Sequence, residues 1–287
     1  MRFYFVTNVF KWGRFGGPQS RAKCIIAALQ RFADFPYEVL MGIPTEFKVA
    51  DSDMVHVQSN RDLVVSFVRM NAPLIVGPNF QWQSAAQEIL QYSGMRAVLL
   101  QRPDPVAKNQ NPVWIDRVRF LPAFFDDEFW QPSPEEKRFD VLTIGKSFAY
   151  PEYLRNLALL QRLLNKRKLK HFHLNSFTPE EYRSKLAQSR VLAYPSPREA
   201  GASLANALLE ASAMNVPVVG LKSVLRDEYG EWDASRGIRV ETIEEMVDAI
   251  PDLVEKSPRF TPRDWSVQNY GLRAGYERFR TILDEVW

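Results

Sequence analysis

Short apolar runs alternate with amphipathic stretches along the first half of the chain. Each run is almost continuously apolar, as is typical of strands buried on both faces of a sheet. The intervening stretches carry apolar residues at helical spacing, for example Ile25, Ile26 and Leu29. This alternation predicts a parallel sheet with helices on both faces. The expected strands are 2–7, 37–41, 54–57, 73–76 and 97–100, and the expected helices are 20–32, 61–70 and 83–92.

The same pattern starts again after the polar, proline-rich stretch 131–137. The stretch separates two series of strands and helices, so it is the natural domain boundary. We expect an N-terminal Rossmann-like domain at 1–131, a C-terminal Rossmann-like domain at 132–262, and a final helix at 263–287 that packs back on the first domain. The expected strands are 141–144, 171–174, 191–194, 216–220 and 237–240, the expected helices are 153–165, 179–188, 202–214 and 243–254, and 265–286 has a long helical pattern.

Composition and charge restrict the classes of function. The 287 residues suffice for two compact domains, and no apolar run approaches the roughly 20 residues that span a bilayer. A net charge of +3 does not indicate a general nucleic-acid-binding protein. The single cysteine, Cys24, cannot form an internal disulfide and fits a reducing, cytoplasmic compartment. The apolar and basic helix 20–32 leaves a peripheral membrane contact open as an alternative.

The most informative motif follows the expected strand 191–194. It begins with the sequence 195–199, Pro-Ser-Pro-Arg-Glu, and continues through a turn containing Gly201 into a helix that carries Glu210. A glycine-containing turn before a helix presents free N–H groups at the positive end of the helix, where a diphosphate can bind. A carboxylate further along that helix can accept hydrogen bonds from ribose hydroxyls.

This succession, completed by the strand sequence 216–219, resembles the signature of retaining GT-B glycosyltransferases of glycosyltransferase family 4, the glycosyl transferases group 1. The resemblance covers almost the whole chain and is most specific in the C-terminal half. It implies an α/β fold of the GT-B type, with two doubly wound Rossmann-like domains facing across a cleft. It also implies a nucleoside diphosphate sugar, a UDP- or GDP-sugar, as donor.

The resemblance assigns roles to residues of this motif. Glu210 would bind the nucleotide ribose, and Glu199 would contact the donor sugar. The turn residues that hold the diphosphate would be Gly201, Ala202 and Ser203. Ten residues lie between Glu199 and Glu210, which is more than the family usually has. The turn therefore has an insertion, which we favour, or the first glutamate is lost and Ala202 stands in its place.

Two cations follow the expected strand 141–144. Lys146 comes after Gly145 at the end of the strand, and Arg155 opens the next helix, where the family commonly has a similar pair. Fixed cations stabilise the negative charge that a departing diphosphate gains as the glycosidic bond breaks. The resemblance thus implies a catalytic set of Lys146, Arg155 and Glu199, with Gly145 at the donor. An ordinary surface position is the alternative for each cation.

The N-terminal half resembles the family more loosely. The pair Gly16-Gly17 lies between the first strand and the first helix, where the family's glycine pair faces the acceptor and the donor phosphate. Glycine permits such close approach of the backbone. Asn79 takes the place of an active-site histidine, and it can hydrogen-bond a sugar hydroxyl but cannot titrate. His56 lies within an apolar strand, so we expect a core histidine.

These features together predict transfer of a sugar from a nucleoside diphosphate sugar to an acceptor hydroxyl, with retention of configuration and without a metal ion. The paired carboxylates Asp126 and Asp127 lie in the linker, where solvation is the simpler interpretation. The acceptor stays open among a glycan, a lipid-linked sugar and a nucleic acid. Two alternatives remain: a transferase that modifies a nucleobase of DNA, and a catalytically inactive GT-B module that binds a partner or a glycan.

Overall fold

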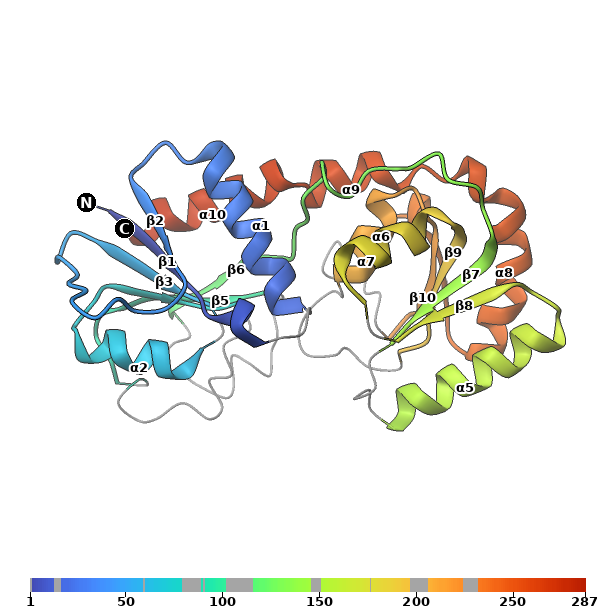
Figure 1. The fold of residues 1–287 in the computed structure, drawn as a ribbon, viewed down its shortest axis with the longest axis horizontal. Helices are drawn as coiled ribbons and strands as arrows, with labels where there is room; N and C mark the ends of the chain where they lie inside the picture. The colour runs from blue at the N-terminus through green and yellow to red at the C-terminus, as the bar shows by residue number, and fades with distance from the viewer. Residues whose placement is uncertain are drawn as a thin grey trace. The chain divides into compact units, whose positions relative to one another are not determined.

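The computed structural model describes residues 2–12, 17–58, 60–78, 89, 91–101, 116–145, 151–175, 177–196, 206–223 and 232–287, without the side chains of residues 11, 12 and 17. The chain forms two compact units, whose helices and strands are drawn in Figure 1. Unit 1 comprises Met1–Phe124 and Leu272–Trp287, and unit 2 comprises Phe125–Gly271. No described helix is both long enough and apolar enough to cross a bilayer.

Unit 1 is built on a six-stranded sheet whose neighbouring strands all pair in parallel. The strand order β2-β1-β3-β4-β5-β6 reverses between β1 and β3, so this pair is the topological switch point, where ligands of such sheets bind. In the register of this pair, Phe5 lies opposite His56. The strands are β1 (Phe3–Val6), β2 (Tyr37–Leu40), β3 (Met54–Val57), β4 (Leu74–Val76), β5 (Met95–Leu100) and β6 (Val118–Phe120).

Both faces of this sheet are covered by helices. Phe3 and Phe5 of β1 lie in a core with α1 (Gly17–Phe32) and α10 (Leu272–Val286). The intervening Tyr4 and Val6 lie in a second core with α2 (Arg61–Arg69). Successive side chains of a strand point to opposite faces, which explains why β1 is apolar throughout. Figure 1 shows α1 and α10 on one side of the sheet and α2 on the other.

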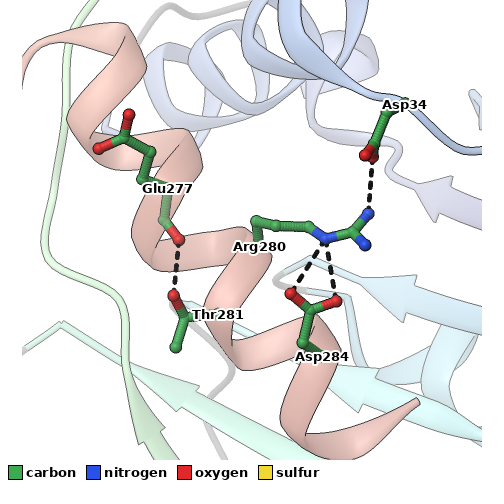
Figure 2. A network of polar contacts seen from close by, with 5 residues as sticks. All are labelled: Asp34, Glu277, Arg280, Thr281 and Asp284. Atoms are coloured by element: carbon green, nitrogen blue, oxygen red, sulfur yellow. Dashed lines mark hydrogen bonds and ion pairs between the residues drawn. The ribbon is translucent and has the colours of Figure 1, made fainter.

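The C-terminal helix α10 is fixed to unit 1 by apolar and polar contacts. Phe279 is 1% exposed, and its ring packs edge-on against Phe3 with centroids 5.8 Å apart. Figure 2 shows Arg280 between two carboxylates, with Nη1 2.7 Å from Asp34 and Nε 2.9 Å from Asp284. The last helix of the chain is therefore part of the same core as the first strand.

Unit 2 contains a five-stranded parallel sheet in the order β11-β10-β9-β7-β8. Its order reverses between β7 and β9, which makes that pair the switch point of this unit. The strands are β7 (Phe139–Ile144), β8 (His171–Leu174), β9 (Ser189–Tyr194), β10 (Val218–Leu221) and β11 (Gly237–Val240). The helices are α5 (Pro151–Lys166), α6 (Pro179–Ala187), α7 (Asn206–Ala213), α8 (Ile243–Lys256) and α9 (Pro262–Tyr270). Three short 3-10 helices complete the described elements of the two units: η1 (Val9–Trp12) in unit 1, and η5 (Ala234–Arg236) and η6 (Ser257–Arg259) in unit 2.

Local sequence explains where several elements of unit 2 begin. Thr178 and Glu181 form a capping box at the start of α6, in which each side chain bonds the backbone N–H of the other residue. Gly237, at the start of β11, has a φ of +136°, and a Cβ there would lie 2.0 Å from the Val218 carbonyl oxygen. Leu160 of α5 and Met246 of α8 are fully buried in one core on the same face of the sheet.

The structure differs from the sequence-based expectation in two elements, and two other expected elements fall partly outside the described residues. The pattern at 265–286 forms two helices, because α9 ends at Gly271, where a Cβ would lie 2.5 Å from the Val267 carbonyl oxygen. The edge strand β6 was not predicted, since its three residues are only partly buried. The expected helix at 83–92 falls mostly outside the described residues, as do residues 202–205 of the expected helix 202–214.

The two units divide the chain at other positions than the expected boundaries at 131 and 262. The segment from Phe125 to Gln131 lies in unit 2, where the Phe125 amide donates to the Tyr270 carbonyl oxygen at 2.9 Å. Helix α9 also belongs to unit 2, because it packs against α7. The chain therefore passes from unit 1 to unit 2 between Phe124 and Phe125, and returns to unit 1 between Gly271 and Leu272.

Candidate functional site

The switch point of unit 2 brings two strand ends and one helix together. Gly145 directly follows β7, and its amide donates to the Leu174 carbonyl oxygen at 3.1 Å. Pro195 directly follows β9, and its carbonyl oxygen accepts a 3.1 Å hydrogen bond from the Asn156 side chain of α5. Because β7 and β9 are the strands where the order reverses, this bond spans the crevice in which open α/β sheets bind ligands.

Gly145 lies against an aromatic side chain. A Cβ at this position would come within 2.8 Å of the Tyr153 ring, so the residue must be glycine unless that ring moves. The Tyr153 hydroxyl donates to the Ile144 carbonyl oxygen, the last of β7. Burial raises the pKa of Tyr153, and nearby Tyr194 adds to the rise. Tyr153 thus fixes the start of α5 against the end of β7 as a neutral phenol.

Arg155 stands next to Asn156 on α5, and its side chain is exposed. The structure therefore places one of the two predicted cations on the helix that borders the switch point. Helix α5 begins with Pro151 and Glu152, which suit its first turn by fixed φ and by negative charge, respectively. An exposed cation here leaves the alternative of an ordinary surface position open.

Glu210 is buried in the middle of α7, with an exposed fraction of 5%. Glu210 is therefore not on the exposed surface of the helix. A buried carboxylate needs hydrogen-bonding or charged partners to stay ionised. Such a carboxylate can accept hydrogen bonds from the hydroxyl groups of a ligand.

The Tyr182 side chain lies near this carboxylate. The Tyr182 hydroxyl of α6 donates to the Ala207 carbonyl oxygen in the first turn of α7 at 2.9 Å. Burial raises the pKa of Tyr182 well above its ordinary value, and the nearby Glu210 carboxylate and Tyr194 contribute to the rise. Tyr194 is the last residue of β9, and burial raises its pKa too, against the effect of its hydrogen bond with Ser196.

Sequence reasoning did not single out the three tyrosines Tyr153, Tyr182 and Tyr194. Tyr194 could have been noticed as the last residue of a strand that leads into the motif. The other two are ordinary buried positions of amphipathic helices, and only the fold shows that they meet at one site.

The switch point of unit 1 contains Gln58, which directly follows β3. Its Nε2 donates to the Pro18 carbonyl oxygen at 2.9 Å and so connects β3 to the first turn of α1. Gly17, one of the predicted acceptor-side glycines, is the first residue of that helix. The carboxyl end of β3 and the start of α1 therefore lie together, as expected at a switch point.

His56 is a core residue, as predicted. Its Nε2 lies 2.5 Å from the Gly77 carbonyl oxygen, and its ring packs against Phe5 and Phe279 with centroids 5.2 and 5.5 Å apart. Burial lowers the pKa of His56 to about 4, despite the bond to Gly77. A neutral, enclosed imidazole of this kind stabilises the packing of α10 on the sheet and is not positioned as a catalyst.

Several predicted site residues fall outside the described residues: Gly16, Asn79, Lys146, Glu199, Gly201, Ala202 and Ser203. Their roles stay predictions, including the choice between an insertion before Glu210 and loss of the first glutamate. Within the described part of the chain, no three His, Cys, Asp or Glu side chains gather as metal ligands would. The expectation that no metal is required stays a prediction as well.

Residues 115–256, which include most of unit 2, match the family model of the glycosyl transferases group 1. No curated protein matches the chain by sequence.

Solved structures share the fold at low sequence identity. HepE of Anabaena, solved with UDP-glucose, is 13% identical with a TM-score of 0.62, and the alignment covers 99% of both chains. Sucrose-phosphate synthase of Thermosynechococcus elongatus is 9% identical with a TM-score of 0.63, over 99% of this chain and 98% of that one.

A third similar structure is longer than this chain. It is a TarM variant of S. aureus, solved with fondaparinux, alpha-GlcNAc-glycerol and UDP, which is 13% identical with a TM-score of 0.55. The alignment covers 82% of this chain but only 56% of the TarM chain. At these identities the likeness concerns the fold alone. The chain therefore has the GT-B fold of glycosyltransferases, and its segment 115–256 matches the family model of the glycosyl transferases group 1.

Proposed function

We propose that this chain is a retaining glycosyltransferase that moves a sugar from a nucleoside diphosphate sugar to an acceptor hydroxyl. The observation that carries the proposal is the buried Glu210 of α7, which lies within the segment that matches the glycosyl transferases group 1. This carboxylate is only 5% exposed beside a switch point, and burial penalises its charge unless it is hydrogen-bonded or paired.

The donor occupies the switch point of unit 2 in this proposal. The Glu210 carboxylate accepts hydrogen bonds from the ribose hydroxyls. The diphosphate binds at the start of α7 with Gly201, Ala202 and Ser203, where backbone N–H groups and the helix dipole favour an anion. Gly145 lies against Tyr153 at the end of β7, and a larger residue there would displace that ring.

Catalysis follows from the charge that develops on the leaving group. When the bond between the anomeric carbon and the diphosphate oxygen breaks, the electron pair stays on that oxygen, and Lys146 and Arg155 stabilise the added negative charge. The acceptor hydroxyl attacks the oxocarbenium-like sugar on the same face and passes its proton to the leaving phosphate. Glu199 orients the donor sugar, and Gly16, Gly17 and Asn79 border the acceptor.

Two similar structures supply a reason to test uridine nucleotides first, since TarM was solved with UDP and HepE with UDP-glucose. We propose a hydroxyl of a glycan or of a lipid-linked sugar as the acceptor. A UDP-sugar donor is proposed ahead of a GDP-sugar for the same reason.

The test is thermal unfolding of the purified chain with UDP, GDP, ADP and their sugars, without added metal. A ligand that binds only the native state stabilises it by mass action, by about 2.7 kcal/mol at a hundredfold excess over its dissociation constant. We expect one base to raise the melting temperature. Incubation of that sugar nucleotide with candidate acceptors, followed by NMR of the anomeric proton, then tests retention. A chain that responds to no nucleotide would be the inactive module.

A further inference from the structure

The start of α9 is joined to two other parts of unit 2 through one guanidinium. Arg263 Nη1 donates to the carbonyl oxygens of Ala213 at 2.7 Å and of Trp130 at 2.5 Å. Its Nη2 donates to the carbonyl oxygen of Asp127 at 2.8 Å. Arg263 therefore binds the last residue of α7 and the segment through which the chain enters unit 2.

The backbone around Arg263 strengthens this connection. The Arg263 amide donates to the Asn215 side-chain oxygen at 3.0 Å, and Asn215 has the positive φ of 55° in the turn that follows α7. The last carbonyl groups of a helix have no partner within it and carry the negative end of its dipole. A guanidinium at that end satisfies a carbonyl and has the favourable charge.

Other side chains hold α7 at its beginning and middle. Tyr182 donates to Ala207 in the first turn, and the Tyr182 ring packs against Trp130 with centroids 5.6 Å apart. Arg236 is fully buried, and it donates to the Ser212 hydroxyl at 3.0 Å and to the Leu208 carbonyl oxygen at 3.2 Å. Helix α7 thus depends on side chains from three other elements.

This dependence matters because α7 is short. Its described part has eight residues, and an isolated helix of that length is not stable in water. Its position is therefore set by the groups that hold it. Ala213, which binds Arg263, lies three residues after Glu210, so a shift of the last turn moves the Glu210 carboxylate as well.

We propose that Arg263 is a positioning residue for the nucleotide site: it fixes the last turn of α7 and thereby the location of the Glu210 carboxylate. The inference rests on the proposed function, in which Glu210 binds the ribose. Arg263 itself acts at the opposite end of α7 from the turn proposed for the diphosphate. Lysine cannot replace it fully, because one ammonium lacks the planar fork that reaches three carbonyl oxygens at once.

A double-mutant cycle tests the proposal. Dissociation constants for UDP and GDP are measured by calorimetry for the wild type, Arg263→Gln, Glu210→Gln and the double variant. Arg259→Gln is the matched control, because Arg259 is an exposed arginine in the neighbouring η6. We expect Arg263→Gln to weaken binding about tenfold in the wild-type background and less than about twofold in the Glu210→Gln background, since contacting or coupled residues are not additive.

Each outcome has a distinct meaning. Equal losses in both backgrounds would show a general loosening of unit 2 and would overturn the positioning role, as would an Arg263→Gln variant that binds like the wild type. Arg263→Lys, which should show an intermediate loss, replaces Arg263→Gln if circular dichroism shows that the latter is unfolded. A wild-type chain that binds neither nucleotide would refute the proposed function itself, and this inference with it.

Discussion

The Asn156 side-chain amide donates a 3.1 Å hydrogen bond to the Pro195 carbonyl oxygen, and this bond joins α5 to the end of β9. Strand β7 leads into α5, and β9 leads into the motif before α7, so the bond connects the two sides of the switch point. In the function proposed above, the catalytic cations on one side and the Glu210 carboxylate on the other must keep a fixed separation.

Loss of this bond should affect both stability and binding. We expect Asn156→Ala to lower the free energy of unfolding by about 1 kcal/mol, the usual value for one hydrogen bond. Asn165→Ala, at an exposed position of the same helix, should change it by less than about 0.5 kcal/mol. Urea denaturation followed by circular dichroism measures both, and equal effects of the two substitutions would contradict the structural role of Asn156.

Gly145→Ala should disturb the same switch point, at the end of β7. The new Cβ would lie 2.8 Å from the Tyr153 ring, so the ring must move and weaken its hydrogen bond to Ile144. We expect a destabilisation of about 1–3 kcal/mol, which is typical of overpacking. Thermal unfolding of the variant checks this, and an unchanged melting temperature would show that Tyr153 is not held there.

The pH dependence of stability should contain a contribution from His56. Its pKa is lowered by burial to about 4, so the unfolded chain binds a proton more readily than the folded chain between pH 6.5 and 4. The stabilisation is complete above pH 6.5 and is lost as the pH falls towards 4, by about 3 kcal/mol in total. Urea unfolding at pH 7 and pH 4.5 should show a smaller loss for His56→Gln than for the wild type. Equal losses of stability in the wild type and in His56→Gln would show that His56 is not the source of this pH dependence.

Two neighbouring residues of α10 should differ strongly in their effect on stability. Phe279 is 1% exposed and packs in the core, whereas Arg280 forms its ion pairs at the surface. We expect Phe279→Ala to cost about 3–5 kcal/mol and Arg280→Ala about 1 kcal/mol or less. Raised salt should reduce only the second effect. Urea denaturation at low and at high salt measures both costs. A larger cost for Arg280→Ala than for Phe279→Ala would contradict this prediction.

The alternation of apolar runs predicted most strands and helices of both units, because parallel strands buried on both faces leave a strong local signal. Gly271 could not be recognised as a helix end, since a glycine inside a helical pattern does not by itself break it. The partly buried β6 has too little apolar sequence to stand out. Trp130 packs on Tyr182, which is distant from it in the sequence. The expected boundary at 131 did not take account of this contact, because local sequence patterns do not reveal it.

Sequence reasoning singled out Glu210 as a candidate but did not show which side chains lie near it. Residues 208–213 are all buried, so α7 lacks the polar face that would reveal which side chains meet a ligand. The contacts of Arg263 are to three backbone carbonyl groups in two separate segments, and no sequence motif encodes such contacts. Positioning residues of this kind follow only from the fold.

The central claim is that Glu210 binds the ribose of a nucleoside diphosphate. The measurement that tests it most directly is the calorimetric dissociation constant for UDP and GDP of the wild type, Glu210→Gln and the control Glu244→Gln, an exposed glutamate of α8. Hydrogen bonds to a charged group contribute about 1.5–3 kcal/mol, so we predict that Glu210→Gln weakens binding by about tenfold or more and that the control does not. Equal affinities of the wild type and Glu210→Gln would contradict the account.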